Sequence, residues 1–244
     1  MKKLLATLLF VPALSWAAGA SLHLDRAPDV SGDNAALQNG AKLFVTYCLN
    51  CHGASHLRYQ KLLDLGFTEE QVKESLMTTA DKIGEQMRVA IRPDEAKAWF
   101  GAAPPDLTLV ARARASGDGS GADWLYTYLR SFYKDETRPT GWNNLVFENV
   151  GMPHALWELQ GTQVLKTEVG SDGKAHKSLE LAKAGLMSAK DYDKQVADLV
   201  GFMVWMGEPT AGLRKSLGVG VLIFLFVLFG LAYALKREFW KDIH

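Results

Sequence analysis

The chain has 244 residues, of which 48% are apolar and 22% are charged, and its 27 Lys or Arg residues balance its 27 Asp or Glu residues. This composition is close to that of ordinary globular proteins and excludes a disordered or collagen-like chain. The balanced charge gives no indication of a nucleic-acid partner.

The first 17 residues have the pattern of a secretory signal peptide. Lys2 and Lys3 form a basic start, an apolar run follows, and Ser15-Trp16-Ala17 is a small-residue cleavage signal. The apolar run is too short to span a bilayer. We therefore predict that residues 1–17 are removed and that the remainder is exported. A buried N-terminal helix is the alternative interpretation.

Helical spacing of apolar residues marks two long segments. The first covers residues 37–48, with Ser31 or Asp33 as its candidate cap, and the second covers residues 192–203 and ends before Pro209. Periodicity alone does not say which segments meet.

Cys48 and Cys51 are the two cysteines of the chain, and His52 follows them directly. A zinc site needs four ligands, but the sequence holds no second Cys pair and no His-x-x-x-His to complete one. A thioredoxin-type pair follows a strand, whereas the segment before these cysteines is predicted to be a helix. Covalent haem attachment needs two thiols and a following histidine that faces the iron, which matches this motif. We predict haem attachment, and a disulfide is the alternative. Small c-type cytochromes pack an N-terminal and a C-terminal helix together around a haem, and that resemblance predicts the same pairing of the two long segments here.

The middle of the chain is predicted to consist of short helices and loops. The predicted helices are residues 55–65, 68–77, 106–115 and 123–132. Residues 162–181 alternate weakly around a Gly-Ser-Asp-Gly sequence and are predicted to form a hairpin. Gly40, on the first long helix, would allow a neighbouring backbone to approach closely.

The iron of a bound haem needs a second axial ligand or an open position opposite His52. The candidates are His23, His56, His154, His176, Met77, Met87, Met152, Met187, Met203 and Met206. Methionines on the apolar face of the last long helix are expected to fill the core. Met152 stands between Gly151 and Pro153, where the glycine allows close approach and the proline stiffens the loop. The local sequence favours Met152, with His154 as its close rival.

Residues 216–235 are 20 residues without a charge and are flanked by basic residues. As a helix they would span about 30 Å, which matches the hydrocarbon core of a bilayer. We predict one membrane anchor, an exported domain of residues 18–213 and a basic cytoplasmic tail of residues 236–244. The exported domain has 20 Lys or Arg against 25 Asp or Glu residues, and this acidic surface suits a basic soluble partner.

Several short stretches together resemble one family. In chain order they are Cys48-Leu-Asn-Cys-His52, Arg58-Tyr59, Gly101-Ala-Ala-Pro-Pro-Asp-Leu107, Arg112-Ala-Arg114, Gly151-Met-Pro153, Trp205-Met-Gly-Glu-Pro209 and the C-terminal anchor. Their order and spacing resemble the cytochrome c1 family, the haem subunits of bacterial cytochrome bc1 complexes. The Cys-x-x-Cys-His motif is common to all c-type cytochromes, whereas the Pro-Pro-Asp-Leu stretch with a single anchor is much more specific.

The resemblance implies a mainly α fold: a class I c-type cytochrome-like haem domain with loop insertions, plus one C-terminal transmembrane helix. It implies one covalent haem c, with His52 and Met152 as the axial ligands. The His52 ring N–H would donate to a backbone carbonyl of Pro104-Pro105, which fixes the imidazole. Arg114 would contact a haem propionate, with Arg112 as its rival.

The same resemblance implies electron transfer rather than stand-alone catalysis. The domain would accept single electrons from a Rieske iron–sulfur protein, beside cytochrome b, and pass them to a soluble or membrane-bound cytochrome c in the respiratory chain. It would lie in the periplasm and be anchored in the lipid of the bacterial inner membrane. Some relatives brace the loop near the methionine with a cysteine pair that this chain lacks, and residues 162–190 match poorly. A haem enzyme or ligand sensor with an open iron position is the alternative.

Overall fold

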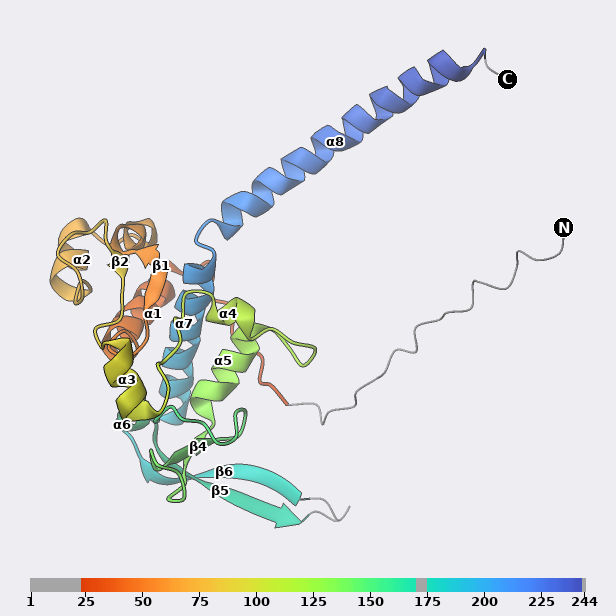
Figure 1. The fold of residues 1–244 in the computed structure, drawn as a ribbon. Coiled ribbons are helices and arrows are strands. Elements are labelled where there is room, and N and C mark those ends of the chain that lie inside the picture. Colours follow the sequence, from red (N-terminus) through yellow and green to blue (C-terminus); the bar gives the residue numbers. More distant parts are fainter. Residues whose placement is uncertain (1–22, 170–174, 243–244) are drawn as a thin grey trace.

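The computed structural model describes residues 23–169 and 175–242 (Figure 1). The predicted signal peptide, residues 1–17, lies outside this part of the chain, as does the turn of the predicted hairpin. The helices are α1 (Asn34–Tyr47), the 3-10 helix η1 (Tyr59–Leu65), α2 (Glu69–Ser75), α3 (Pro93–Phe100), α4 (Val110–Ala113), α5 (Gly121–Arg130), α6 (Trp157–Gln160), α7 (Ala189–Gly207) and α8 (Ala211–Trp240).

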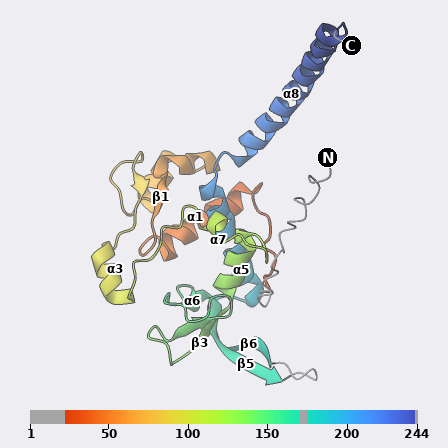
Figure 2. The same ribbon diagram turned by 45° about the vertical axis from the view of Figure 1, so that its right-hand side comes forward.

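Strands form three small antiparallel sheets at the edges of this helical framework. They are β1 (Ala54–Arg58) with β2 (Gln86–Met87), β3 (Phe132–Lys134) with β4 (Trp142–Asn144), and β5 (Gly161–Val169) with β6 (Ala175–Ala184). The predicted hairpin over residues 162–181 is confirmed by the β5–β6 pair, which projects from the helices in both views (Figures 1 and 2).

Helices α1 and α7 pack side by side in the centre of the molecule, as the resemblance to small c-type cytochromes predicted (Figures 1 and 2). A Cβ atom on Gly40 would lie 2.1 Å from the carbonyl oxygen of Asp198, so only glycine permits this approach. The rings of Phe44 and Phe202 meet beside it with centroids 5.6 Å apart. Of the two candidate caps, Asp33 begins α1 by accepting a hydrogen bond from the Ala36 N–H.

The predicted helix over residues 55–65 is wrong in its first half. Residues up to Arg58 form strand β1, because Arg58 and Ala54 pair with β2 across a long loop. The second half is the 3-10 helix η1, which Gly66 ends with a φ of 91°. The capping box of Thr68 and Gln71 at the start of α2 is confirmed, although α2 ends before Met77.

Two further segments differ from the sequence prediction. The helix expected over residues 106–115 shrinks to the four residues of α4, because the Asp106 side chain is used by a loop contact described below. The helix expected over residues 123–132 is α5, which begins at Gly121 after the Ser120 cap, and Phe132 starts strand β3 instead. Helix α3 was not predicted, although Pro93 and Gly101 mark its two ends.

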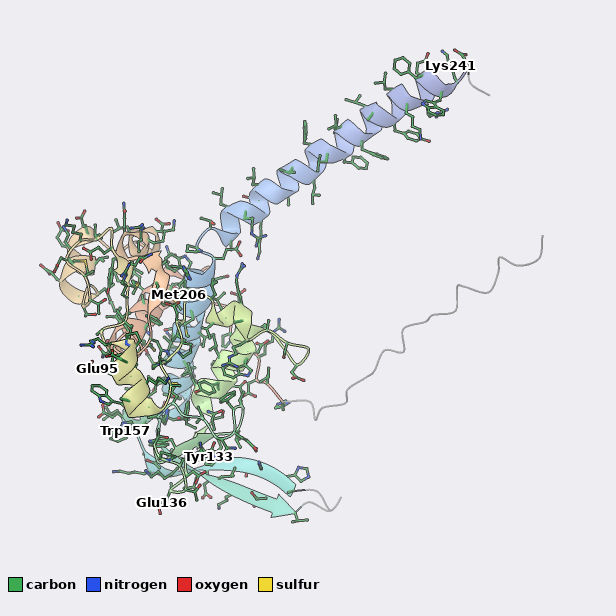
Figure 3. All side chains as sticks on the ribbon, in the orientation of Figure 1. Glu95, Tyr133, Glu136, Trp157, Met206 and Lys241 are labelled. Carbon is green, nitrogen blue, oxygen red and sulfur yellow. The ribbon has the colours of Figure 1, made fainter. Side chains whose placement is uncertain are left out.

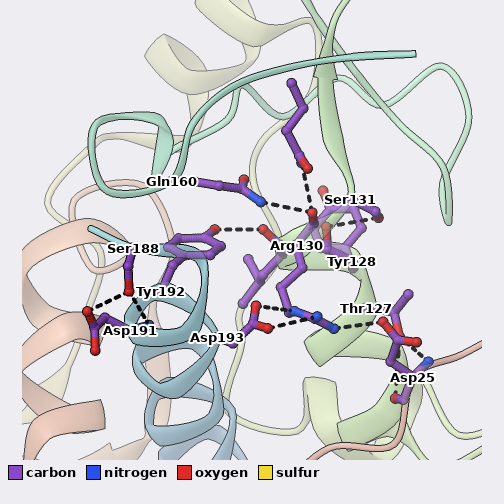
Figure 4. A network of polar contacts seen from close by, with 12 residues as sticks. Asp25, Thr127, Tyr128, Arg130, Ser131, Gln160, Ser188, Asp191, Tyr192 and Asp193 are labelled. Carbon is purple, nitrogen blue, oxygen red and sulfur yellow. Dashed lines mark hydrogen bonds and ion pairs between the residues drawn. The ribbon is translucent and has the colours of Figure 1, made fainter. Parts of the chain in front are cut away.

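A polar network joins the N-terminal segment, α5 and α7 (Figure 4). The Arg130 guanidinium donates to Asp193 at 2.6 Å and to Asp25 at 2.7 Å. The Tyr192 hydroxyl donates to the Leu129 carbonyl oxygen at 2.8 Å, and the Asp25 N–H donates to Thr127. These bonds fix the segment that precedes α1 against the two helices that frame the domain.

Helix α8 has 30 residues, and its most apolar window has a mean hydropathy of 2.5 with none of that window buried. Among the described residues it is the one helix long and apolar enough to cross a membrane. It extends away from the domain, with side chains exposed on all sides up to Lys241 (Figure 3). At its base, Glu208 accepts hydrogen bonds from both Arg112 and Arg214. This helix contains the predicted span of residues 216–235.

Candidate haem site

The two cysteines and the following histidine lie on a single turn at the end of α1. The Cys48 N–H closes the helix on the Phe44 carbonyl oxygen at 2.9 Å. The Cys48 carbonyl oxygen then accepts from the N–H groups of Cys51, at 3.0 Å, and His52, at 2.8 Å. Neither sulfur is in a disulfide. Two thiols and an imidazole on one rigid turn are the donor set that covalent haem attachment requires.

Burial raises the pKa of the Cys48 thiol to about 12, and the proximity of Cys51 adds to this effect. The thiol is therefore protonated at neutral pH. Dithiol oxidoreductases work in the opposite way, with a thiol pKa lowered towards neutrality. This electrostatic environment argues against a redox pair of the thioredoxin type.

The His52 ring is fixed by the backbone of Pro105. Its Nδ1 lies 2.7 Å from the Pro105 carbonyl oxygen, and because a carbonyl only accepts, Nδ1 carries the proton. The other ring nitrogen, Nε2, then holds the lone pair that a metal would bind. Burial lowers the pKa of His52, against the opposing effects of the Pro105 hydrogen bond and of Asp106, so the neutral ring is favoured.

Asp106 holds this carbonyl in place by joining two loops. Its carboxylate accepts from the Ser55 N–H at 2.7 Å and from the Thr108 N–H at 2.9 Å. Beside it, the Leu107 N–H donates to the Gly53 carbonyl oxygen at 2.8 Å. Burial opposes ionisation of Asp106, but the hydrogen bonds from Thr108 and Ser55 outweigh it and keep its pKa below the ordinary value.

Met152 and His154, the two rivals for the second axial position, have different surroundings. Met152 is half-buried, and its Sδ accepts a hydrogen bond of 3.4 Å from the Tyr128 hydroxyl. His154 is buried, stacks on Phe132 with centroids 4.8 Å apart, and pairs its Nε2 with Gln160 at 2.7 Å. Burial lowers the pKa of His154 to about 4, against the opposing Gln160 bond. These contacts assign His154 to the core and favour Met152.

The other candidate ligands lie in the core or on the surface. Met87, Met203 and Met206 are core residues, and Met77 and Met187 are half-buried against the core. His23, His56 and His176 are exposed.

Arg114 lies on an aromatic cluster that reaches the Met152 region. Its guanidinium carbon is 4.4 Å from the Trp124 ring centroid and 5.5 Å from that of Phe147. Trp124 in turn stacks on Tyr128, the hydrogen-bond donor to Met152, with centroids 4.8 Å apart. Arg112 instead pairs with Glu208 at the base of the membrane helix. This placement favours Arg114 over Arg112 as the propionate contact, which remains a prediction.

Sequence reasoning missed Tyr128 and the role of Asp106. Trp124 and Tyr128 stand four residues apart on α5, and Phe132 follows after the same interval at the start of β3, a spacing that could have marked an aromatic cluster. The Asp-x-Thr order at Asp106 is typical of a side chain that bonds the backbone two residues later. Both signals were present, but neither identifies its distant partner.

Comparison with known proteins covers nearly the whole chain. The sequence profile of the Cytochrome C1 family matches residues 27–243. The chain is 47% identical over 244 residues to the ammonia monooxygenase gamma subunit of Nitrosomonas europaea, covering 100% of this chain and 99% of that protein. It is 43% identical over 248 aligned positions to cytochrome c1 of Allochromatium vinosum, with the same coverage. Cytochrome c1 of Rhodospirillum rubrum is 29% identical over 86% of this chain and 83% of its own length.

Proposed function

The chain belongs to the cytochrome c1 family, and from this premise we propose that it is the membrane-anchored electron-transfer subunit of a quinol–cytochrome c reductase. The protein carries covalently bound haem c in a mainly α domain and has one C-terminal transmembrane helix. The observation that carries the proposal is the turn from Cys48 to His52, whose imidazole is fixed by the Pro105 carbonyl oxygen.

Each residue of the site then has a separate role. When bound, haem c supplies an iron that gains and loses a single electron. Cys48 and Cys51 would hold the group through thioether bonds, and His52 Nε2 and Met152 Sδ would be the two protein ligands of its iron. Pro105 fixes the tautomer and direction of the imidazole. Two protein ligands leave no open position, which favours electron transfer over chemistry on oxygen.

The electron is proposed to come from a Rieske iron–sulfur protein beside cytochrome b and to leave on a soluble or membrane-bound cytochrome c. The predicted exported domain contains 20 Lys or Arg residues and 25 Asp or Glu residues, so its formal charge is negative. A negative charge supports a basic electron acceptor. The name of one relative, "Cytochrome b/c1", also joins the two subunits in one protein.

The protein is anchored in the membrane by α8. We propose that residues 18–213 form the periplasmic domain, with residues 236–244 on the cytoplasmic side of the bacterial inner membrane. The signal-peptide pattern of residues 1–17 supports this orientation, and so do the basic residues Lys236, Arg237 and Lys241 that follow the apolar span.

One relative has a different name, that of a subunit of an ammonia monooxygenase. That name keeps open the alternative of a haem with a free iron position. The hydrogen bond from Tyr128 holds the Met152 Sδ in a fixed place, which instead supports ligation of the iron by this sulfur. Carbon monoxide separates the two possibilities, because it binds a ferrous iron only where a ligand position is free or weakly held.

The test uses membranes that contain the full chain. We expect a pyridine haemochrome spectrum of haem c, a haem mass that stays on the chain after denaturation, and co-purification with a cytochrome b. The reduced protein should not bind carbon monoxide at neutral pH. A colourless mature protein would refute the proposal, and ready carbon monoxide binding by the intact protein would favour the open-site alternative.

A further inference from the structure

Asn149, three residues before Met152, has an unusual backbone conformation. Its φ is 62°, and among the described residues it is the one non-glycine residue with a positive φ. The left-handed region is costly for residues with a Cβ, although asparagine tolerates it better than most. This conformation turns the chain sharply just before the loop that carries the sulfur, so some other group must hold it.

Arg138 holds Asn149 from the turn between β3 and β4. One guanidinium nitrogen donates to Asn149 Oδ1 at 3.1 Å, and another donates to the Asn149 carbonyl oxygen at 3.0 Å. The Asn149 N–H donates to Asn143 Oδ1 at 2.8 Å. The Arg138 Nε is buried without a partner, which is the energetic cost of this arrangement. The guanidinium thus faces the carbonyl oxygen and the side-chain amide of Asn149.

A second asparagine anchors the beginning of the same loop. Asn144 is fully buried, and its Oδ1 accepts from the N–H groups of Val146, at 2.9 Å, and Phe147, at 3.2 Å. Its Nδ2 donates to the Tyr128 carbonyl oxygen at 2.8 Å. The loop is therefore tied to α5 and β4 as far as Asn149. Beyond that point only Val150 and Gly151 precede Met152.

We propose that Arg138 and Asn149 form a clamp that positions the Met152 sulfur for the iron. The clamp fixes the direction in which the chain leaves Asn149, and Gly151 adds no restraint, because nothing lies within 4 Å of the position that a Cβ would take there. Both are positioning residues, since they act through Met152. This inference rests on the proposed ligation of iron by Met152.

The experiment compares variants of the full-length holoprotein in membranes or detergent. Asn149→Ala removes Oδ1 and disfavours the left-handed backbone, Asn149→Gly removes only the side chain, and Arg138→Leu removes both donors. Asn149→Asp is the conservative variant, because aspartate tolerates the left-handed region and offers Arg138 a carboxylate. Glu148→Gln is the matched control in the same loop, since it breaks only an exposed ion pair with Lys177.

The readout is the charge-transfer band of a sulfur–iron(III) bond, measured with haem content and helical circular dichroism at a temperature where the protein is folded. We expect Asn149→Ala and Arg138→Leu to lose most of the band and to gain carbon monoxide binding in the reduced state. Asn149→Gly should lose part of the band, whereas Asn149→Asp and Glu148→Gln should keep it.

Met152→Ala provides the endpoint and separates the two proposals. If the unmodified protein has the same spectrum as Met152→Ala, the proposed ligand is wrong. If those two differ but Asn149→Ala and Asn149→Gly keep the full band and only melt at lower temperature, the clamp is merely structural and the inference is overturned. Should Arg138→Leu fail to accumulate, Asn149→Ala and Asn149→Gly decide the question.

Discussion

The hydroxyl group of Tyr128 donates a hydrogen bond to the sulfur of Met152 across 3.4 Å. The Tyr128 ring is held between Trp124, at a centroid distance of 4.8 Å, and Phe132, at 5.0 Å. Because the ring cannot swing freely between these neighbours, the hydroxyl has a fixed direction. The donor therefore acts on the electronic character of the sulfur as well as on its position.

Replacing Tyr128 by Phe keeps the ring stack and removes the donor. A hydrogen bond draws electron density from the sulfur and so favours the ferrous iron, and its loss should lower the reduction potential. One hydrogen bond of about 1 kcal/mol corresponds to a shift on the order of 40 mV for one electron. A redox titration followed in the visible spectrum measures it. Tyr126→Phe on the same helix is the control, and an unchanged or raised potential in Tyr128→Phe would contradict the argument.

Gly40→Ala tests the contact between α1 and α7. The added Cβ would lie 2.1 Å from the Asp198 carbonyl oxygen and 2.8 Å from the Phe202 Cβ. Forcing two packed backbones apart should cost about 3 kcal/mol or more, which lowers the melting temperature by roughly 6–12 °C. Gly32→Ala is the matched control, because nothing lies within 4 Å of its Cβ position. Equal melting temperatures for the two variants would disprove the close approach.

Asp106→Ala tests the contact that holds the Pro105 carbonyl beside His52. The variant leaves the Ser55 and Thr108 N–H groups without their acceptor. Hydrogen bonds to a charged group contribute about 1.5–3 kcal/mol each, which gives about 3–6 kcal/mol for the two bonds. Asp106 is exposed and water screens these bonds, so we expect a smaller loss of about 2–4 kcal/mol in the free energy of unfolding. Denaturant unfolding of the holoprotein measures it. Asp94→Ala removes an exposed ion pair with Arg92 and should change the free energy of unfolding little. An equal loss in Asp94→Ala would show that the Asp106 contacts make no special contribution to stability.

Asp123→Asn tests the pH dependence of stability. Burial opposes ionisation of the Asp123 carboxylate, but the hydrogen bonds that it accepts from Ser120 and from the Ala27 N–H outweigh burial and lower its pKa below 3.8. A lowered pKa stabilises the fold above the unfolded value of 3.8, and this contribution disappears as the pH falls through the folded value. The difference in melting temperature between the unmodified protein and Asp123→Asn should therefore be constant near neutral pH and shrink in acid. A difference that grows in acid would mean that folding raises the pKa of Asp123 instead of lowering it.

The parts of the fold that could be predicted from sequence are those set by neighbouring residues. The apolar stripes of α1 and α7, the Asp33 cap and the turn at the cysteines all depend on residues within a few positions of each other. The packing of α1 on α7 came from a family resemblance, and Gly40 then supplied its physical reason.

The parts that could not be predicted depend on partners far along the chain. Residues 54–58 become a strand only because Gln86 and Met87 pair with them. Asp106 could have started a helix, but its oxygens bind the backbone near Ser55 instead. Arg138 and Asn149 have no periodic signature, because their contact joins a hairpin turn to a loop. The hydrogen bond from Tyr128 to Met152 is of the same kind.

Glu208 lies in the short connection between the haem domain and its anchor. Only residues 208–210 separate the end of α7 from the start of α8, and three residues extend over about 10 Å at most. Glu208 also bonds to Arg112 on one side and to Arg214 on the other. A carrier on so short a tether cannot shuttle between distant sites. Any long-range movement during electron transfer therefore has to be made by the electron donor and the electron acceptor.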